Sequence, residues 1–228
     1  MRLIIIFSAF MAGYSCLAQT LAVNTAISYG SYYDIKNVDG QYEKKYQPQI
    51  GYRMGLEINN IPNNSPIHTS LCLYYQSYGG SFYTKLRGLG GTIYDDGQIT
   101  KNVMGIDFAP IGIQFLRHFT LSCGLSFNVT LLYQISGIHS WFVGGTPPRN
   151  GTVQLKDLHQ FVNRFNFGAF GTLGYRFEFG KLVLEPRYSY DVGLSEEFNH
   201  LQADTKSKKQ LLTISLGYKI GKNAKKGL

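Results

Sequence analysis

The sequence predicts an all-β chain that folds as an eight-stranded antiparallel up-and-down transmembrane β-barrel. Three observations carry this prediction: apolar and polar residues alternate along most of the chain, the connections are long and short in turn, and charged residues avoid the apolar face. The composition agrees, because 17 Tyr, 15 Phe and 26 Gly against 16% charged residues favour strands, tight turns and girdles of aromatic rings.

The first eighteen residues have the pattern of a secretory signal peptide. Arg2 precedes the apolar run of residues 3–10, and small residues, Cys16 and Ala18, stand at the −3 and −1 positions of a cleavage after Ala18. The run is too short to span a bilayer as a helix. Cys16 raises the alternative of a lipoprotein, which the bulky Tyr14 disfavours. We therefore predict a leader at 1–18, a barrel domain at 19–221, a basic C-terminal tail at 222–228, and an outer-membrane location.

Four alternating segments are expected in the first half, at about residues 22–33, 48–59, 68–79 and 103–115. In the fourth, the apolar parity shifts after Pro110. Because proline cannot donate to the strand ladder, we expect a β-bulge there. The apolar faces of the four segments are Val23, Ile27 and Tyr29; Ile50, Tyr52, Met54, Leu56 and Ile58; Leu71, Leu73 and Tyr75; and Ile106 and Phe108, then Ile111, Ile113 and Phe115.

Four more segments follow, at about residues 119–135, 163–178, 182–194 and 210–220. The fifth segment is the most regular of the eight. An even number of strands suits a closed antiparallel barrel. The apolar faces are Phe119, Leu121, Leu125, Phe127, Val129 and Leu131; Phe165, Phe167, Leu173, Tyr175 and Phe177; Leu182, Leu184, Tyr188, Tyr190 and Val192; and Leu212, Ile214, Leu216, Tyr218 and Ile220.

The connections between these segments alternate in length. In chain order they are residues 34–47, 60–67, 80–102, 116–118, 136–162, 179–181 and 195–209. Outer-membrane barrels have long outer loops and short periplasmic turns, so this order predicts four long outer loops and both termini on the periplasmic side.

Charge placement separates a membrane barrel from a soluble lipocalin-like barrel, which also alternates but buries its apolar face. Of the 14 lysines, only Lys219 falls within a predicted segment. The polar face carries five cations and five anions, which predicts a neutralised interior plugged by its own side chains. These predicted structural residues are Arg53, Glu57, Asp107, Arg164, Arg176, Glu178, Glu185, Arg187, Asp191 and Lys219.

Several motifs resemble the outer-membrane β-barrel domain common in Bacteroidetes, which includes PorT-like proteins. They are Phe165-Asn166-Phe167-Gly168, Gly180-Lys181-Leu182, Glu185-Pro186-Arg187-Tyr188, Gly193-Leu194 and Leu216-Gly217-Tyr218. The resemblance implies a barrel with a role in the envelope or in protein secretion. The chain departs from the pattern at its end, where Ile220 and a basic tail replace a final aromatic residue.

No catalytic, cofactor-binding or metal-ligating set is predicted. The five histidines show no metal spacing, and Cys72 and Cys123 fall on opposite faces, so both are expected to be free thiols. His139, Ser140 and His159 leave open a lipid-modifying enzyme, with chance polar loop residues as the alternative.

The leading hypothesis for function is a non-enzymatic barrel whose outer loops bind a partner. Outer-membrane lipid or lipopolysaccharide is the expected contact, together with other envelope or secretion-system proteins and no nucleic acid; the run Lys206-Ser207-Lys208-Lys209 suits anionic lipopolysaccharide. Solvated charge is the alternative for that run, and a narrow channel or transporter is the alternative function.

Overall fold

The computed structural model describes residues 20–34, 42–60, 67–88, 90–116, 118–144, 149–156, 163–197 and 205–220, in which every regular element is a β-strand. No helix in these ranges is long and apolar enough to cross a membrane. The predicted leader and the basic tail lie outside the described residues. The strands are β1 (Thr20–Asp34), β2 (Tyr42–Asn60), β3 (Ile67–Gly88), β4 (Gly91–Phe115), β5 (Phe119–Val143), β6 (Arg149–Lys156), β7 (Phe165–Tyr175), β8 (Phe177–Phe179), β9 (Leu182–Gly193) and β10 (Thr205–Lys219).

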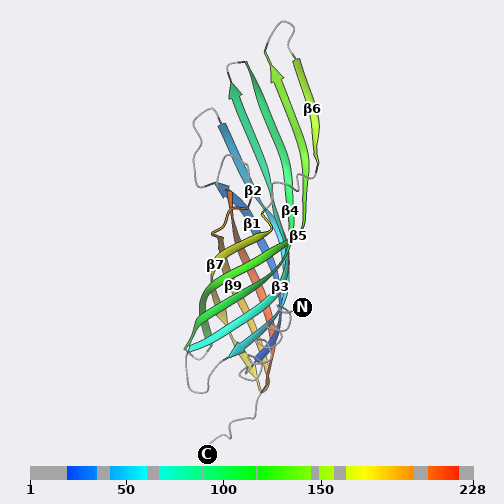
Figure 1. Cartoon of the computed structure of the whole chain (residues 1–228). Coiled ribbons are helices and arrows are strands. Elements are labelled where there is room, and N and C mark those ends of the chain that lie inside the picture. The colour runs from blue at the N-terminus through cyan, green and yellow to red at the C-terminus, as the bar shows by residue number, and fades with distance from the viewer. Residues whose placement is uncertain are drawn as a thin grey trace, which may run out of the picture.

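Eight of these strands form a closed antiparallel ring in the order β1, β2, β3, β4, β5, β7, β9 and β10 (Figure 1). The ring closes because β10 pairs with β9 on one side and with β1 on the other, where Thr20 lies opposite Lys219 and Asp34 opposite Thr205. The predicted eight-stranded up-and-down barrel is therefore confirmed. Of the two remaining strands, β6 pairs with β5 outside the ring, and β8 continues β7 along β9 in the same register, since Gly174 lies opposite Arg187 and Phe177 opposite Leu184.

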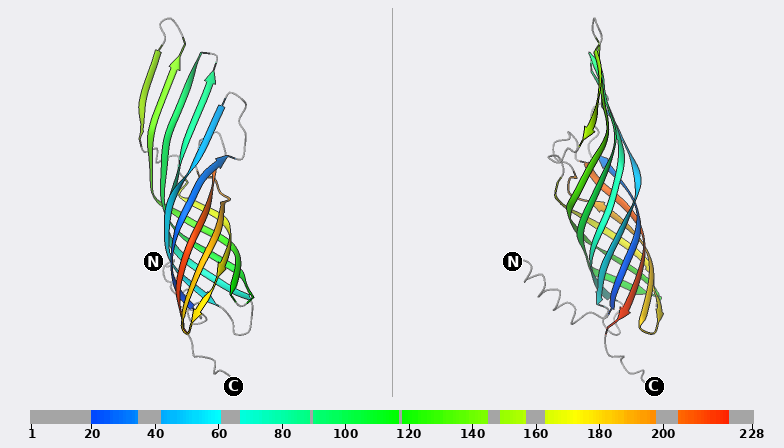
Figure 2. Two further views of the ribbon diagram at one scale, coloured as in Figure 1. Left: turned by 180° about the vertical axis from the view of Figure 1, so that it is seen from behind. Right: turned by 90° about the vertical axis from the view of Figure 1, so that its right-hand side faces the viewer.

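Strands β2 to β6 continue past the ring at one end as a single-layered sheet. We call this sheet the extension; it comprises residues 42–48, 79–88, 91–100, 135–143 and 149–156. Figure 1 shows it rising from the barrel, and the right-hand view of Figure 2 shows it nearly edge-on as a thin blade. The opposite end of the barrel carries the short connections and the paired ends of β1 and β10. We call that end the turn end.

The extension corrects the prediction that residues 80–102 form a long loop. In the structure β3 and β4 are joined by a tight hairpin in which Gly88 lies opposite Gly91. Much of the predicted loop 136–162 is likewise the end of β5 and all of β6. The apolar face that marked the predicted segments is needed only where a strand faces lipid, so that signal stops before the strands do.

The predicted distribution of lysines is also wrong, because the strands continue beyond the segments that the apolar signal marks. In the part of the chain that the structure describes, nine lysines, not one, lie in strands, and eight of them lie on strand portions that the sequence placed in loops: Lys44, Lys45, Lys85, Lys101, Lys156, Lys206, Lys208 and Lys209. The charge-free outer face therefore holds only for the part of the strands nearer the turn end.

The predicted bulge at Pro110 is confirmed by a register shift between Phe108 and Ile111 where β4 pairs with β5. A second shift in the same pair lies between Asn102 and Val103 and leaves Leu131 as the additional residue on β5. Leu131 and Leu132 are consequently both exposed, and Tyr133 turns inward and is buried. This second bulge has no proline to mark it in the sequence.

The predicted segment at 163–178 is divided in two. Strand β7 ends at Tyr175, Arg176 lies between strands, and β8 forms a short hairpin with the start of β9. Gly180 makes the hairpin turn with φ of +65°, a conformation that costs glycine little because it has no Cβ. The alternation continues through the interruption, so Arg176 faces the interior like Gly174 and is buried at the turn end of the barrel.

Candidate functional site

The outer wall of the barrel is an apolar belt bounded by aromatic residues. On β1 the outward residues run from Leu21 through Val23 and Ile27 to Tyr29, all of them exposed. Eight residues rising about 3.3 Å each at a tilt of about 40° span roughly 20 Å along the barrel axis, close to the apolar height of membrane barrels. Contact of these exposed apolar side chains with lipid hydrocarbon is favourable, whereas their contact with water is unfavourable.

Aromatic rings gather at both rims of this belt. At the turn end Phe119 stacks against Phe115 at 5.5 Å and meets Tyr175 edge-on at 4.9 Å, both between ring centroids. Towards the extension, the rings of Tyr52 and Tyr75 lie 6.2 Å apart. Paired girdles are typical of barrels that sit between two membrane–water interfaces.

Inside the belt the interior is polar, and near the turn end it is organised by Arg187. This guanidinium reaches Glu57 Oε2 at 2.5 Å through Nη1, and Glu185 through Nε at 2.9 Å and Nη2 at 3.1 Å. Thr120 Oγ1 donates to Glu185 Oε1 at 2.6 Å, and Asn24 Nδ2 donates to Glu57 Oε2 at 2.5 Å. Each buried carboxylate is thereby bound by a cation and by a neutral donor, which offsets the cost of its desolvation.

Arg176 extends this cluster to the turn end. Its Nε lies 2.9 Å from Glu178 Oε1, and its Nη1 lies 3.8 Å from Glu185 Oε2. Lys219 Nζ approaches Glu178 Oε2 at 2.6 Å, in a pair that is more than one-third exposed. A screened pair of this kind closes the rim of the barrel and contributes little stability.

A second cluster crosses the middle of the barrel. Arg53 forms an ion pair with Asp107 and places its guanidinium carbon 3.6 Å from the centroid of the Tyr74 ring. Gly105 faces that ring, and a Cβ at this position would lie 2.5 Å from the Tyr74 hydroxyl oxygen. The absence of a side chain at residue 105 therefore makes room for the tyrosine that the arginine stacks on.

A third cluster, near the extension, was missed by the sequence reasoning. Lys101 pairs with Glu197, and their side chains are 0% and 2% exposed. The Tyr78 hydroxyl donates to both Glu197 carboxylate oxygens, at 3.3 and 3.4 Å. Lys101 lies two residues before Val103, so both occupy interior positions in the alternation of β4. A predicted strand that began before Lys101 would therefore have placed its side chain inside. No comparable sequence signal marks Glu197, which follows β9.

Glu197 lies beyond the apolar belt, because the outward residues at the level of Lys101 are polar, as at Thr100 and Gln134. Burial disfavours the charged form of Glu197, but the Lys101 ammonium and hydrogen bonds from Lys101 and Ser207 outweigh that effect. The pKa of Glu197 consequently lies below its ordinary value of 4.5. The Glu197 backbone is fixed as well, since its N–H donates to the Thr205 carbonyl at 2.8 Å.

Of the ten charged residues predicted for the interior, the structure brings nine into ion pairs. Asp191 meets Lys209 Nζ at 3.9 Å, and the pairs of the other eight are those given above. Arg164 differs: it is exposed just before β7 and joins no ion pair with a described residue. Lys101, Glu197 and Lys209 are additional interior charges, so together with the other nine predicted residues the described ion pairs of the barrel involve six cations and six anions.

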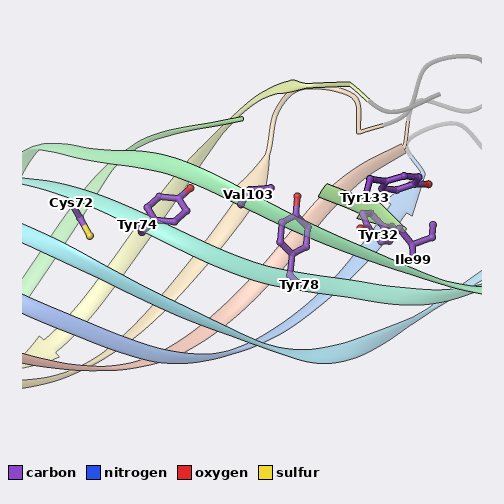
Figure 3. Close-up of a cluster of buried hydrophobic side chains, with 7 residues drawn as sticks. All are labelled: Tyr32, Cys72, Tyr74, Tyr78, Ile99, Val103 and Tyr133. Atoms are coloured by element: carbon purple, nitrogen blue, oxygen red, sulfur yellow. The ribbon is translucent and has the colours of Figure 1, made fainter. Parts of the chain in front are cut away.

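Little open space remains in the barrel. The two interior cavities have volumes of about 50 and about 10 Å³, and Arg53, Glu57, Arg187 and Asp191 line the larger. A volume near 10–15 Å³ is about what one water needs. At the extension end, Tyr32, Ile99 and Tyr133 close the interior, and Tyr78 and Val103 lie next to them towards the middle of the barrel (Figure 3).

No protein-family model and no curated protein sequence matches this chain. Among solved structures it is similar to Neisserial surface protein A, with 9% identity, a TM-score of 0.40, and coverage of 88% of this chain and 97% of that one. It is also similar to Ail, the attachment invasion locus protein of Yersinia pestis (9%, 0.37, 88% and 99%), and to OprG from Pseudomonas aeruginosa (11%, 0.37, 89% and 96%). At this identity the likeness is one of fold, and the barrel itself is established by the strand pairing.

The candidate enzymatic residues do not form a nucleophile–base pair in the described part of the chain. His139 Nδ1 lies 2.5 Å from Asp95 Oδ1, but Ser140, the next residue on β5, points to the opposite face and contacts Thr152 Oγ1 at 3.3 Å. His159 lies outside the described residues. Among the described residues, no group of three or more His, Cys, Asp and Glu side chains could hold a metal.

The two cysteines among the described residues, Cys72 and Cys123, are free and stand on opposite sides of the wall, as predicted. Cys72 is buried in the interior, where Arg53 Nη2 and Asn24 Nδ2 approach its sulfur at 3.8 and 3.6 Å. Cys123 is exposed on the belt. Strand β4 lies between the strands that carry them, and the two thiols are on opposite sides of the wall, so neither can reach the other without unfolding of the barrel.

The inward face of the extension, continuous with the barrel interior, carries an apolar patch of Phe82, Leu86, Ile93 and Trp141 beside the polar pair of Asp95 and His139. Leu86 and Ile93 are exposed. The outward face is mixed: it carries Lys45 and Lys85, with Lys85 Nζ 5.1 Å from the centroid of the Tyr94 ring, and also the exposed Ile138 and Phe142. The exposed apolar residues of the inward face are available for contact with a partner.

Proposed function

We propose that this chain is a non-enzymatic integral outer-membrane β-barrel that holds the extension outside the cell, where its inward face binds a partner of the envelope or a secretion system. The observation that carries the proposal is the combination of a filled, charge-balanced barrel interior with the exposed apolar patch on the inward face of the extension. The predicted leader ending at Ala18 supports export, and short connections at the turn end support a periplasmic position for that end.

The PorT-like assignment is the finer form of this proposal and rests on the sequence resemblance alone. It is supported by residues 165–168, 180–182 and 185–188, which in the structure are the start of β7, the β8–β9 turn and the middle of β9. These are structural positions, so they support the fold more than the role in secretion.

Capture by the full-length protein in native envelope tests partner binding by the extension. Trp141→Ser removes an aromatic ring from the inward face, and Tyr94→Ser, on the next strand, removes one from the outward face as a matched control. We expect Trp141→Ser to lose a co-purifying partner that Tyr94→Ser retains. Equal recovery with both variants would contradict the proposed role of the inward face.

A narrow channel is the second candidate function, because the two interior cavities lie along one polar interior. Planar-bilayer recording separates the two. The filled interior predicts no stable open state, and regular conductance steps from the purified barrel would favour the channel.

A further inference from the structure

The outward residues of β10 change from apolar to polar and then to charged with distance from the turn end. From the turn end they are Tyr218, Leu216, Ile214 and Leu212, all apolar and exposed, then Gln210, and finally Lys208 and Lys206. Two lysines on the same face therefore follow directly above the apolar belt. In a membrane barrel this is the level of the headgroups of the outer leaflet.

Tyrosine side chains of the neighbouring strands β1 and β9 lie around Lys208. Tyr190 of β9, Gln210 and Tyr29 of β1 lie side by side in one row, so two phenol rings mark the edge of the belt. Two residues further, Lys208 lies opposite Ser31, and its Nζ is 6.0 Å from the centroid of the Tyr33 ring. The amine thus stands above an aromatic rim.

A cavity opens here because β1 and β2 separate. Their pairing ends at Gly30 opposite Gln49, while β1 continues along β10 and β2 continues along β3 (Figure 2, left). The cavity has a volume of about 280 Å³ and is lined by Tyr29, Ser31, Tyr46, Pro48, Tyr190 and Lys208, among others. It is several times larger than either cavity inside the barrel.

The lysines around this cavity differ in their partners. Lys209 is committed to the barrel interior, where its Nζ lies 3.9 Å from Asp191 and 4.6 Å from the centroid of the Tyr78 ring. Lys206 and Lys208 form no ion pair with a described carboxylate. Two ammonium groups without such a partner, beside tyrosines at the edge of the belt, match a phosphate that is attached to an apolar chain.

We propose that the cavity between β1 and β2 binds the phosphate-bearing headgroup of an anionic lipid of the outer leaflet. Lys208, with Lys206 above it, binds the phosphate, while Tyr29 and Tyr190 contact the part of the lipid where the headgroup joins its chains. This inference rests on the proposed membrane location and deepens it, because it names one lipid-specific site on an otherwise uniform belt.

The test uses the full-length protein in nanodiscs of phosphatidylcholine to which phosphatidylglycerol is added, with retained lipid measured by native mass spectrometry. Lys206→Gln/Lys208→Gln is compared with Lys45→Gln/Lys85→Gln, which removes the same charge from the extension. We expect the first variant to weaken phosphatidylglycerol retention roughly 25-fold, about fivefold per lysine, and the control to leave it unchanged.

A second variant, Ser31→Phe, keeps both lysines and fills the cavity; we expect it to lose the retained lipid as well. Equal retention by all variants, or equal retention of phosphatidylcholine and phosphatidylglycerol, would overturn the site. Displacement by inorganic phosphate alone would overturn the lipid as its ligand. Failure of the protein to insert into nanodiscs would instead contradict the proposed membrane function, so the two failures are distinguishable.

Discussion

Removal of the Glu197 carboxylate tests whether the buried cluster near the extension stabilises the barrel. In Glu197→Gln the Lys101 ammonium stays fully buried but loses its anionic partner, and the Tyr78 hydroxyl loses its acceptor carboxylate. Removal of one member of a buried ion pair costs about 3–5 kcal/mol, because the remaining charge keeps its desolvation penalty. A surface pair would cost about 1 kcal/mol or less.

Reversible urea unfolding in lipid vesicles, followed by tryptophan fluorescence and by heat-modifiable migration, measures this cost. Lys101→Met/Glu197→Gln is the informative partner variant, since it also removes the ammonium that Glu197→Gln deprives of the Glu197 carboxylate. We expect the double variant to recover at least half of the stability that Glu197→Gln loses. A loss below about 1 kcal/mol for Glu197→Gln, or no recovery in the double variant, would refute the buried-pair interpretation.

The contribution of Glu197 to the free energy of unfolding is expected to depend on pH in one direction. Because the pKa of Glu197 is lower in the folded protein than its ordinary value of 4.5, the pair contributes fully above that value and is lost as pH falls through the folded-state pKa. The stability difference between the natural protein and Glu197→Gln is therefore expected to be constant near neutral pH and to shrink in acid. A difference that grew in acid would contradict this sign.

Three further predictions concern the wall of the barrel. Gly105→Val is expected to lose about 1–3 kcal/mol in urea unfolding, since its Cβ overlaps the Tyr74 ring, and Tyr74→Ala should relieve part of that loss; additive losses would refute the overlap. Leu125→Arg, on the lipid face, is expected to cost about 2–4 kcal/mol in vesicles, well above the cost of Leu125→Ala, and equal costs would contradict the orientation of that face. A membrane-permeant maleimide should label Cys123 in the folded barrel and Cys72 only after unfolding, and equal labelling rates would contradict their positions.

The sequence determined which side of the wall most residues face. Side chains of a strand alternate between lipid and interior, and the two environments reject opposite residue types, so a two-residue period carries this information without any knowledge of partners. Arg53 and Leu56, for example, are assigned to their faces by parity alone. The prediction failed at Lys101 because the outward apolar signal ends where the belt ends, although β4 continues.

Which charges meet was decided only by the closed barrel. Glu57 and Arg187 are separated by 130 residues and come together because β2 and β9 face each other across the interior. The separation of β1 and β2 beside Ser31 likewise depends on where their pairing ends. The inward orientation of Tyr133 depends on the β-bulge at Leu131, which no proline marks in the sequence. Pairing register and ring closure are cooperative properties of eight strands, so no local stretch of sequence specifies them.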